Sequence, residues 1–279
     1  MKKILLTLLA LVPFSAFAQA TYDNGLSFGA RATVEADAKL MSGLHLLAHE
    51  EYRYYSNTDD VMRFYTGIGL EYKVLPFLKV GAEYEWIKRF KYDDEALANV
   101  WSTRHRGNFF VTGTWKTPWW QFGVKETLRL TNRPDDLNTL QAPRNALALK
   151  SKVSVKYRGW EKVVPFAAFE LRNTLNDVSY SGTYNASAEK NKDIYTNEEF
   201  LGYKHAYINR YRLQLGVTVK FSKRHELDFY LLGDHYRDKK VDTNREGSDS
   251  YVKNGLVLKS IDWYTGNMIS AGVGYKWSF

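Results

Sequence analysis

Residues 268–279, MISAGVGYKWSF, alternate between two kinds of side chain. From Ile269 through Ala271 and Val273 to Phe279, every second residue is apolar, and the series becomes aromatic towards its end. The residues between them are serine, glycine or lysine. Because successive side chains of a β-strand point to opposite faces, the pattern predicts a strand with one apolar and one polar face. A closing strand that ends on an aromatic residue is typical of a transmembrane β-barrel.

The same stretch resembles the carboxy-terminal signal that the barrel-insertion machinery of bacterial outer membranes reads. The resemblance implies that this machinery is a partner of the strand ending at Phe279 and that outer-membrane lipids surround the folded chain. The expected fold is therefore all-β: a transmembrane, antiparallel, up-and-down β-barrel of ten to twelve strands. A soluble β-sandwich shows the same alternation but seldom finishes on an aromatic strand.

The first residues predict export. Lys2-Lys3 precede an apolar run over residues 4–12, and Ala16-Phe17-Ala18 follows as a small-x-small cleavage pattern. The sequence therefore predicts a signal peptide over residues 1–18, cut after its last alanine, and one outer-membrane barrel domain over residues 19–279. The apolar run is too short to cross a bilayer as a helix, so no membrane anchor is expected there. The expected location is the outer membrane of a Gram-negative-type bacterium.

The composition excludes several classes of protein. No later segment has about 18 consecutive apolar residues, and the mean hydropathy is -0.44, so a helical membrane protein is excluded. Aromatic residues make up 15% of the chain, with 20 Tyr and 8 Trp, as expected for the aromatic girdles of a barrel. The absence of cysteine excludes disulfides and thiolate chemistry. The formal net charge of +8 indicates anionic partners, either small solutes or lipid headgroups, whereas nucleic acid is not expected for an exported chain.

The connections between the alternating segments are of two kinds, tight and long. The tight ones lie near Met41, Pro76, Pro118, Trp160 and Lys223, and those that are long or polar lie near Asp59, Ala96, Leu137, Asn185 and Glu246. Short turns on one side of a membrane and long loops on the other are typical of a barrel. One aromatic girdle is expected beside the short turns (Trp119, Trp120, Trp160, Phe221, Trp277, Phe279) and a second one at Tyr52, Tyr54, Trp86 and Tyr207.

The alternating segments number eleven, whereas a bacterial single-chain barrel has an even number of strands. Either the amino-terminal segment lies outside the wall, which leaves ten strands, or one strand escapes the count, which makes twelve. We favour twelve, because residues 28–36 alternate well and either Gly255–Lys259 or the residues before Phe28 supply the extra piece. Long loops are expected over residues 173–204 and 238–267.

Short motifs along the chain resemble a known family. They are Glu50-Glu51-Tyr52-Arg53, Gly69-Leu70-Glu71-Tyr72-Lys73, Leu78-Lys79-Val80-Gly81-Ala82-Glu83-Tyr84, Arg104-His105-Arg106, Glu126-Thr127-Leu128-Arg129 and Gly272-Val273-Gly274-Tyr275-Lys276-Trp277. On these motifs, which extend over nearly the whole mature chain, the sequence resembles domain of unknown function 2490. The family is of outer-membrane-barrel type and has no assigned activity, so the resemblance implies the fold and implies no functional site.

The polar face of the predicted strands is strongly basic. If the apolar face meets lipid, the polar face lines the lumen. The basic residues expected there, as a surface for transport or binding, are Arg53, Arg63, Lys79, Arg104, Arg106, Lys116, Lys125, Arg129, Lys150, Lys152, Lys156, Arg158, Arg172, Arg210, Arg212 and Lys220. Acidic residues share this face, and hairpin spacing predicts the pairs Glu71 with Lys79, Glu226 with Lys220 and Asp234 with Arg212.

Cross-strand pairing leaves a surplus of positive charge. Lys125, Arg129 and the series at 150, 152, 156 and 158 have few acids in register. A basic strip in a low-dielectric lumen raises the local concentration of anions. The leading prediction is therefore a porin-like passive channel whose lumen favours small anionic or polar solutes, and a purely structural, charge-paired lumen remains open beside it.

Two other functions compete with a channel. The first is an outer-membrane enzyme acting on lipid or glycan. His49 and Glu51 share a polar face, and His105 lies between two arginines, but the sequence shows no nucleophile with a partner. No catalytic residue, metal site or cofactor is therefore predicted. The second is a structural or binding barrel with a plugged lumen, whose tyrosine-containing loop over residues 173–204 supplies the binding surface.

Overall fold

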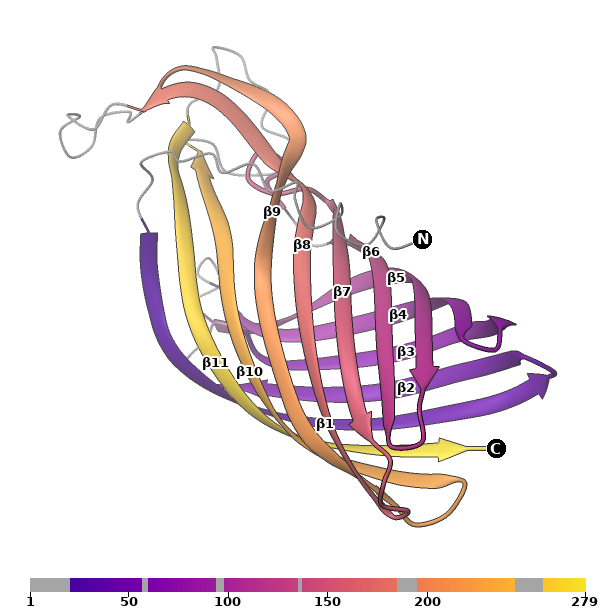
Figure 1. Ribbon diagram of the computed structural model, residues 1–279. Coiled ribbons are helices and arrows are strands. Elements are labelled where there is room, and N and C mark those ends of the chain that lie inside the picture. The colour runs from indigo at the N-terminus through magenta and orange to yellow at the C-terminus, as the bar shows by residue number, and fades with distance from the viewer. Residues whose placement is uncertain (1–20, 57–59, 94–97, 135–136, 185–194, 244–257) are drawn as a thin grey trace.

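The computed structural model describes residues 21–56, 60–93, 98–134, 137–184, 195–243 and 258–279. These residues form β-strands joined by turns and loops, and the strands close into one barrel (Figure 1). Within the described ranges, no helix is long and apolar enough to span a bilayer. The predicted signal peptide, residues 1–18, lies outside the described residues.

The all-β prediction is confirmed, with eleven strands in the described part of the chain. In chain order they are β1 (Thr21–Met41), β2 (Leu44–Tyr55), β3 (Asp60–Leu75), β4 (Leu78–Asp93), β5 (Ala98–Lys116), β6 (Trp120–Asn132), β7 (Asn145–Tyr157), β8 (Val163–Tyr184), β9 (Tyr195–Lys220), β10 (His225–Thr243) and β11 (Leu258–Ser278). They range from 12 residues in β2 to 26 in β9, whereas about 9–11 residues of a tilted strand cross a bilayer. Several strands are therefore longer than a membrane requires.

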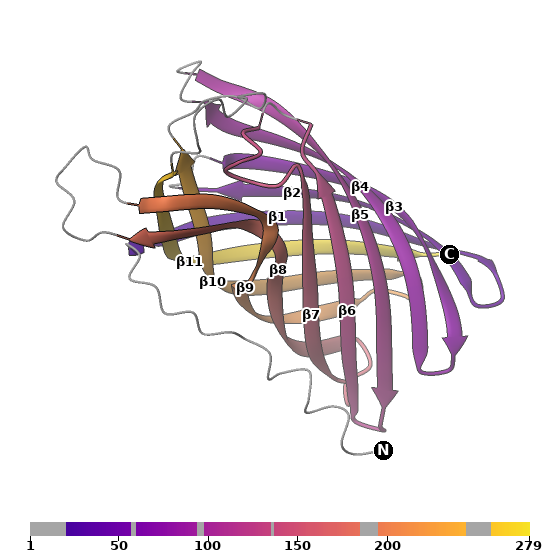
Figure 2. The same cartoon turned by 90° about the horizontal axis from the view of Figure 1, so that it is seen from above.

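The barrel closes between its first and last strands, which lie side by side in Figure 2. Strands that follow one another in the chain pair antiparallel, but β1 and β11 run parallel, with Ala30 opposite Ala271. The expectation of antiparallel pairing throughout is therefore wrong at this seam. An odd number of up-and-down strands brings the first and last strands together in the same direction. The closed barrel of the described residues has eleven strands, which confirms the expected range of ten to twelve. The two even counts within that range, ten and the favoured twelve, are wrong.

Two of the expected loops are largely strand. Within residues 173–204, β8 continues to Tyr184 and β9 begins at Tyr195. Within residues 238–267, β10 continues to Thr243 and β11 begins at Leu258. Of the segment expected as an extra strand at Gly255–Lys259, Leu258 and Lys259 belong to the closing strand, and residues 255–257 lie outside the described residues. Polar residues extend these strands because their backbones pair with a neighbour. A polar paired strand has no hydrophobic alternation by which the sequence can distinguish it from a loop.

The two faces of the wall differ as the alternation predicts. In β11, Ile269 is 46% exposed, whereas the neighbouring Ser270 is 1% exposed. The outward-facing Leu215 of β9 and Leu231 of β10 are 53% and 61% exposed. The outer surface is thus mainly apolar and the interior polar. Glu126 on β6 departs from this pattern, since it faces outward and accepts a hydrogen bond from Ser151 Oγ at 2.6 Å.

The five connections predicted to be tight lie at one end of the barrel and have two to five residues each (Figure 1). At the other end, the β6–β7, β8–β9 and β10–β11 connections have ten or more residues, whereas the β2–β3 and β4–β5 connections have four each. In the turn between β1 and β2, Gly43 has a φ of 79°, a conformation that favours glycine. The six aromatic residues expected beside the short turns are all exposed: Trp119, Trp120, Trp160, Phe221, Trp277 and Phe279. Of the second expected girdle, Tyr54 and Trp86 are exposed. Tyr207 packs instead against Trp263, with ring centroids 4.9 Å apart.

At the long-loop end, the β8–β9 hairpin extends past the wall and bends across the ends of β10 and β11 (Figure 1). A small apolar core holds it there, formed by Val178, Val241, Leu258 and Ile261, with Tyr180 and Phe200 packed against it. This core gives the unusually long strands a structural role outside the barrel wall.

Candidate functional site

The interior of the barrel holds most of the basic residues that the sequence assigns to a lumen. Of the sixteen, Lys116 and Arg158 are exposed at the short-turn end and do not line the interior. The other fourteen occupy inward positions of the strands and are partly buried: Arg53, Arg63, Lys79, Arg104, Arg106, Lys125, Arg129, Lys150, Lys152, Lys156, Arg172, Arg210, Arg212 and Lys220. The interior surface is therefore basic on strands β2 to β9.

A chain of ion pairs follows the inner wall across the parallel seam. On β2, Arg53 Nε donates to Glu51 Oε1 at 2.8 Å. Glu51 also lies 3.8 Å from the guanidinium of Arg31 on β1. Arg31 in turn reaches past β11 to Asp234 on β10, at 3.6 Å. The side chains of Asp234 and Arg31 are 0% and 3% exposed. Each buried charge is therefore stabilised by a partner of opposite sign.

The same chain continues away from the seam. Arg212 on β9 donates from Nε to Asp234 Oδ1 at 2.6 Å and lies 3.5 Å from Glu170 on β8. Lys150 Nζ on β7 lies 2.8 Å from Glu170. The predicted pair of Arg212 with Asp234 is thus present, and the predicted pair of Lys79 with Glu71 is present at 2.6 Å. Lys220 stands directly opposite Glu226, as the hairpin spacing predicts.

His49 meets two carboxylates from a strand that is not its neighbour. From β2 its ring crosses β3, so that Nδ1 lies 2.9 Å from Glu83 and Nε2 lies 3.8 Å from Glu85, both on β4. Gly67 makes room, because a Cβ at that position would meet the imidazole at 2.2 Å. One ligand atom from each of His49, Glu83 and Glu85 lies within 4.8 Å of the others, which is close enough to hold a metal ion. The sequence pointed instead to Glu51 as the partner of His49, but Glu51 binds Arg53.

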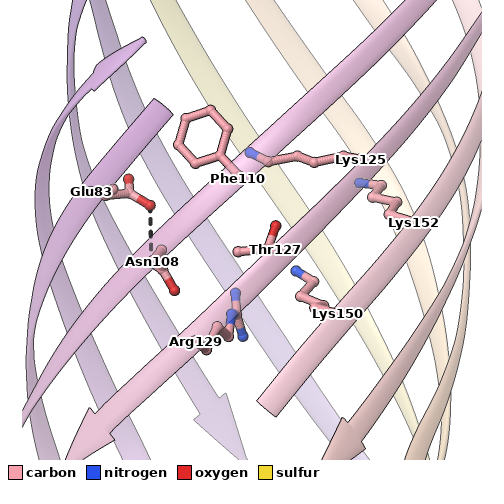
Figure 3. A pocket seen from close by; sticks show the side chains of 8 residues that line it. All are labelled: Glu83, Asn108, Phe110, Lys125, Thr127, Arg129, Lys150 and Lys152. Carbon is pink, nitrogen blue, oxygen red and sulfur yellow. Dashed lines mark hydrogen bonds between the residues drawn. The ribbon is translucent and has the colours of Figure 1, made fainter. Parts of the chain in front are cut away.

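A pocket of about 130 Å³ opens on the inner wall between β4 and β7. Its lining consists of Glu83, Asn108, Phe110, Lys125, Thr127, Arg129, Lys150 and Lys152, as Figure 3 shows. Four of these eight residues are basic and one is acidic. The structure thus brings together four of the six surplus cations that the sequence identified. Lys156 lies outside the pocket, with Nζ 5.8 Å from the centre of the Phe166 ring.

The cations of the pocket are only partly neutralised by the protein. Lys150 has the Glu170 carboxylate, but Lys152 donates only to the neutral Gln214 Oε1, at 3.4 Å. Lys125 Nζ lies 4.1 Å from the centre of the Phe110 ring. Among the described residues, no carboxylate is within ion-pairing distance of Arg129, and its buried Nε has no hydrogen-bond partner. The pocket therefore carries a surplus of positive charge.

Two further histidines, His105 and His45, form structural contacts. His105 Nδ1 lies 2.6 Å from the Tyr84 hydroxyl on the outer surface, and His45 Nδ1 lies 2.7 Å from Asp37 Oδ1. In the part of the chain that the structure describes, no histidine hydrogen-bonds a serine or threonine hydroxyl. The geometry thus offers no serine–histidine pair of the kind that acyl-transfer enzymes use.

His205 marks a second polar cluster, near the small core of the β8–β9 hairpin. It lies fifteen residues from Lys220, the end of β9 at the short turn. At about 3.3 Å per residue, His205 is roughly 50 Å along the strand from the short turn. It therefore lies outside an apolar band about 25 Å tall that begins at the short turns. Lys239 Nζ donates to His205 Nδ1 at 3.1 Å, and Asp177 lies 3.8 Å from the same ammonium. Burial, together with the charge of Lys239, lowers the pKa of His205 to about 4.

The connection between β6 and β7 reaches across the long-loop end. Asn138 Nδ2 donates to Thr243 Oγ1 of β10 at 3.2 Å, and Gln141 Nε2 donates to the same oxygen at 3.4 Å. The Tyr180 hydroxyl of β8 donates to the Leu140 carbonyl. These contacts join strands that are not neighbours in the wall, so the loop covers part of this opening.

Sequence reasoning missed Arg31 and the His49 cluster. Arg31 lies on the polar face of the first alternating segment. The β1–β2 hairpin brings Glu51 to it, but its second partner, Asp234 on β10, is brought to it only by the parallel seam. The signal for the His49 cluster was the glycine pair Gly67 and Gly69 on the inward face of β3. Two small inward residues leave space for a side chain from an adjacent strand to cross.

A family model described as protein of unknown function (DUF2490) matches residues 30–245, which is 216 of the 279 residues. The match begins in β1 and ends just after β10, so it contains the pocket and all members of the interior ion-pair chain. No curated protein matches the chain.

Proposed function

The chain belongs to the DUF2490 family of proteins of unknown function, and we propose that it is an outer-membrane β-barrel whose basic interior favours the passage of small anions. The proposal includes removal of residues 1–18 as a signal peptide, recognition of the closing strand by the insertion machinery, and a wall surrounded by outer-membrane lipid.

Three features of the wall support a place in a membrane. The outward face is mainly apolar, with residues such as Leu215 and Leu231 exposed. Aromatic side chains are exposed beside the short turns. The three connections of ten or more residues lie at the end opposite the turns of β1–β2, β3–β4 and β5–β6. A barrel in water needs none of these, whereas lipid requires an apolar band and favours aromatic residues at its boundaries.

The observation that carries the anion preference is the surplus of cations on β6 and β7. Lys125, Arg129 and Lys152 have no carboxylate within ion-pairing distance among the described residues. Low-dielectric walls focus the field of such groups into the lumen, which raises anion concentration and lowers the barrier for anion entry.

The test is conductance of the purified protein in a planar bilayer with a gradient of potassium chloride. We expect a reversal potential of the sign that chloride selectivity gives. The double substitution Lys150→Gln/Lys152→Gln should move that potential towards zero, because it removes two lumenal charges. Lys88→Gln is the matched control, since Lys88 faces outward with its ammonium over the Trp86 ring, and it should leave selectivity unchanged. Cation selectivity in the unmodified protein would refute the proposal.

A second candidate function is a binding barrel with a closed lumen. The bridge from residues 138–141 to Thr243 favours it, because that bridge covers part of the long-loop opening. The same experiment separates the two functions. A closed barrel gives no current with the full chain, and a current that appears only when residues 138–141 are replaced by a short glycine-serine turn would identify that loop as the plug.

A further inference from the structure

We propose that the pocket between β4 and β7 is a binding site for one small oxyanion, and that it prefers hydrogen phosphate to sulfate. The proposal rests on the anion-favouring interior described above and adds a defined ligand class and a defined place on the wall.

The size of the pocket limits the ligand. A volume of about 130 Å³ is several times the roughly 10–15 Å³ that one water molecule needs. Pockets for drug-sized molecules measure about 300–1,000 Å³. The pocket therefore suits a single tetrahedral oxyanion and is too small for an oligosaccharide or a nucleotide.

The donors of the pocket converge from two adjacent strands. Lys125, Thr127 and Arg129 follow one another on the inward face of β6, and Lys150 and Lys152 do the same on β7 (Figure 3). Ammonium, guanidinium and hydroxyl groups are the usual donors to phosphate and sulfate oxygens, and charge-assisted bonds of this kind are the strong ones. Arg129 is the group most in need of a ligand, because its Nε is buried without a hydrogen-bond partner.

One unpaired acceptor in the same pocket, Asn108 Oδ1, distinguishes between oxyanions. Asn108 is 2% exposed, and its Nδ2 donates to Glu83 Oε2 at 3.1 Å. That bond fixes the amide so that Oδ1 points away from Glu83 (Figure 3), where it is buried with no partner. The orphaned carbonyl oxygen needs a donor, whereas Glu83 already accepts from Asn108 and lies 2.9 Å from His49 Nδ1. Hydrogen phosphate carries a P–OH group that can supply one, whereas sulfate at neutral pH has none, and a site with unpaired buried polar groups rejects such an analogue.

The test is isothermal titration calorimetry on the full-length processed barrel in detergent at neutral pH, with sodium phosphate and sodium sulfate as the probes. We expect one phosphate per chain and sulfate binding at least tenfold weaker. Arg129→Gln should weaken phosphate binding at least tenfold, and Thr127→Val should weaken it without changing the charge of the lumen. Glu83→Gln should narrow the gap between phosphate and sulfate, because an amide can donate to sulfate.

Lys88→Gln, which removes a cation from the outer face, is the control for charge and should bind phosphate normally. Folding of each variant is checked by its heat-dependent migration in gel electrophoresis, and Thr127→Val keeps the test decisive if Arg129→Gln does not fold. Equal binding of the two oxyanions, or phosphate binding that survives both Arg129→Gln and Thr127→Val, would overturn the site. Anion-selective chloride conductance without phosphate binding would refute this site and leave the proposed channel function standing. Phosphate binding without any current would support the site and refute the channel function.

Discussion

Asp234 joins the two halves of the interior ion-pair chain, because it binds Arg31 on one side and Arg212 on the other. Its side chain is fully buried. Asp234→Asn leaves two buried guanidinium groups without that carboxylate, and breaking a buried pair costs about 3–5 kcal/mol. We expect the midpoint of urea-induced unfolding, followed by tryptophan fluorescence of the barrel in liposomes, to fall accordingly.

Glu71→Gln is the matched control for that substitution. It breaks the ion pair with Lys79, whose side chain is 39% exposed. Solvent screens such a pair, so the expected cost is about 0–1 kcal/mol. Equal losses for the two variants would mean that burial does not set the strength of these interior pairs.

The contrast between Arg212 and Arg31 shows what the sequence reveals at the residue scale. The partner of Arg212 follows from hairpin spacing, because the tight turn at residues 221–224 sets the register of β9 against β10. The pairing of Arg31 with Asp234 does not follow, because these two residues lie across a seam between the two ends of the chain. Local turns determine local pairs, whereas a contact over two hundred residues depends on closure of the whole barrel.

At the scale of the strand, Gly67 sets the space between β2 and β4. Gly67→Ala places a methyl group where the His49 ring lies, so the ring must leave Glu83 and Glu85. We expect a loss of about 1–3 kcal/mol, as for other overpacked interiors, in the same unfolding measurement. Gly233→Ala is the control, since a Cβ there meets nothing within 4 Å. A neutral Gly67→Ala would show that His49 takes another position at no cost.

The β8–β9 hairpin is expected to loosen in acid. The neutral ring of His205 accepts a hydrogen bond from Lys239, and its pKa is lowered to about 4 by burial and that charge. The unfolded ring titrates near about 6.5, so the opened hairpin binds the proton more readily than the packed one. The stabilisation is therefore complete above about pH 6.5 and is lost as pH falls towards 4. Because the ring is partly exposed, we expect a loss of roughly 1–2 kcal/mol.

Hydrogen exchange of the Val178 and Val241 amides at pH 7 and pH 4.5, corrected for the intrinsic pH dependence of exchange, measures this loosening. Asp177, Lys239 and Arg237 surround the ring, and the two cations oppose its protonation. His205→Gln should remove the difference between the two pH values, because glutamine does not titrate. A pH effect that persists in this variant would assign the loosening to another group.

The extension of β8 and β9 also shows where sequence patterns stop at the scale of elements. The five tight turns were visible, because glycine, proline and short polar breaks interrupt strong alternation. The outer parts of β8 and β9 pair with each other and contribute Val178, Tyr180 and Phe200 to a core shared with β10 and β11. That core is assembled from positions far apart in the sequence, so no single segment carries its pattern.

For the molecule as a whole, the parallel seam predicts a specific crosslink. Ala30 of β1 and Ala271 of β11 are direct partners, and both face outward. The chain has no native cysteine, so Ala30→Cys/Ala271→Cys should form one disulfide under mild oxidation, visible as a shift in non-reducing electrophoresis. Ala36→Cys/Ala271→Cys, displaced along β1 by about 20 Å, should not. Crosslinking of the second pair alone would indicate a different closure and would reopen the question of an even strand number.

Leu215 tests whether lipid surrounds the molecule. It faces outward and is 53% exposed, five residues from the short-turn end of β9 at Lys220. Along a strand tilted by about 40°, five residues rise roughly 13 Å, half of an apolar band about 25 Å tall. Leu215 therefore sits near the midplane of such a band, where an arginine costs about 2–4 kcal/mol in lipid. In water the same exposed substitution costs within about 0.5 kcal/mol.

The measurement is the free energy of folding of Leu215→Arg into liposomes, with Phe221→Arg as the control. Phe221 is exposed in the turn beyond β9, where an arginine reaches the interface and should cost about 0–1 kcal/mol. A large loss at 215 with a small one at 221 locates the apolar band around the wall. A Leu215→Arg variant that folds without loss in detergent-free buffer would show that the barrel is a protein of aqueous solution. That result would also refute the proposed channel, because ion conduction needs a bilayer for the barrel to cross.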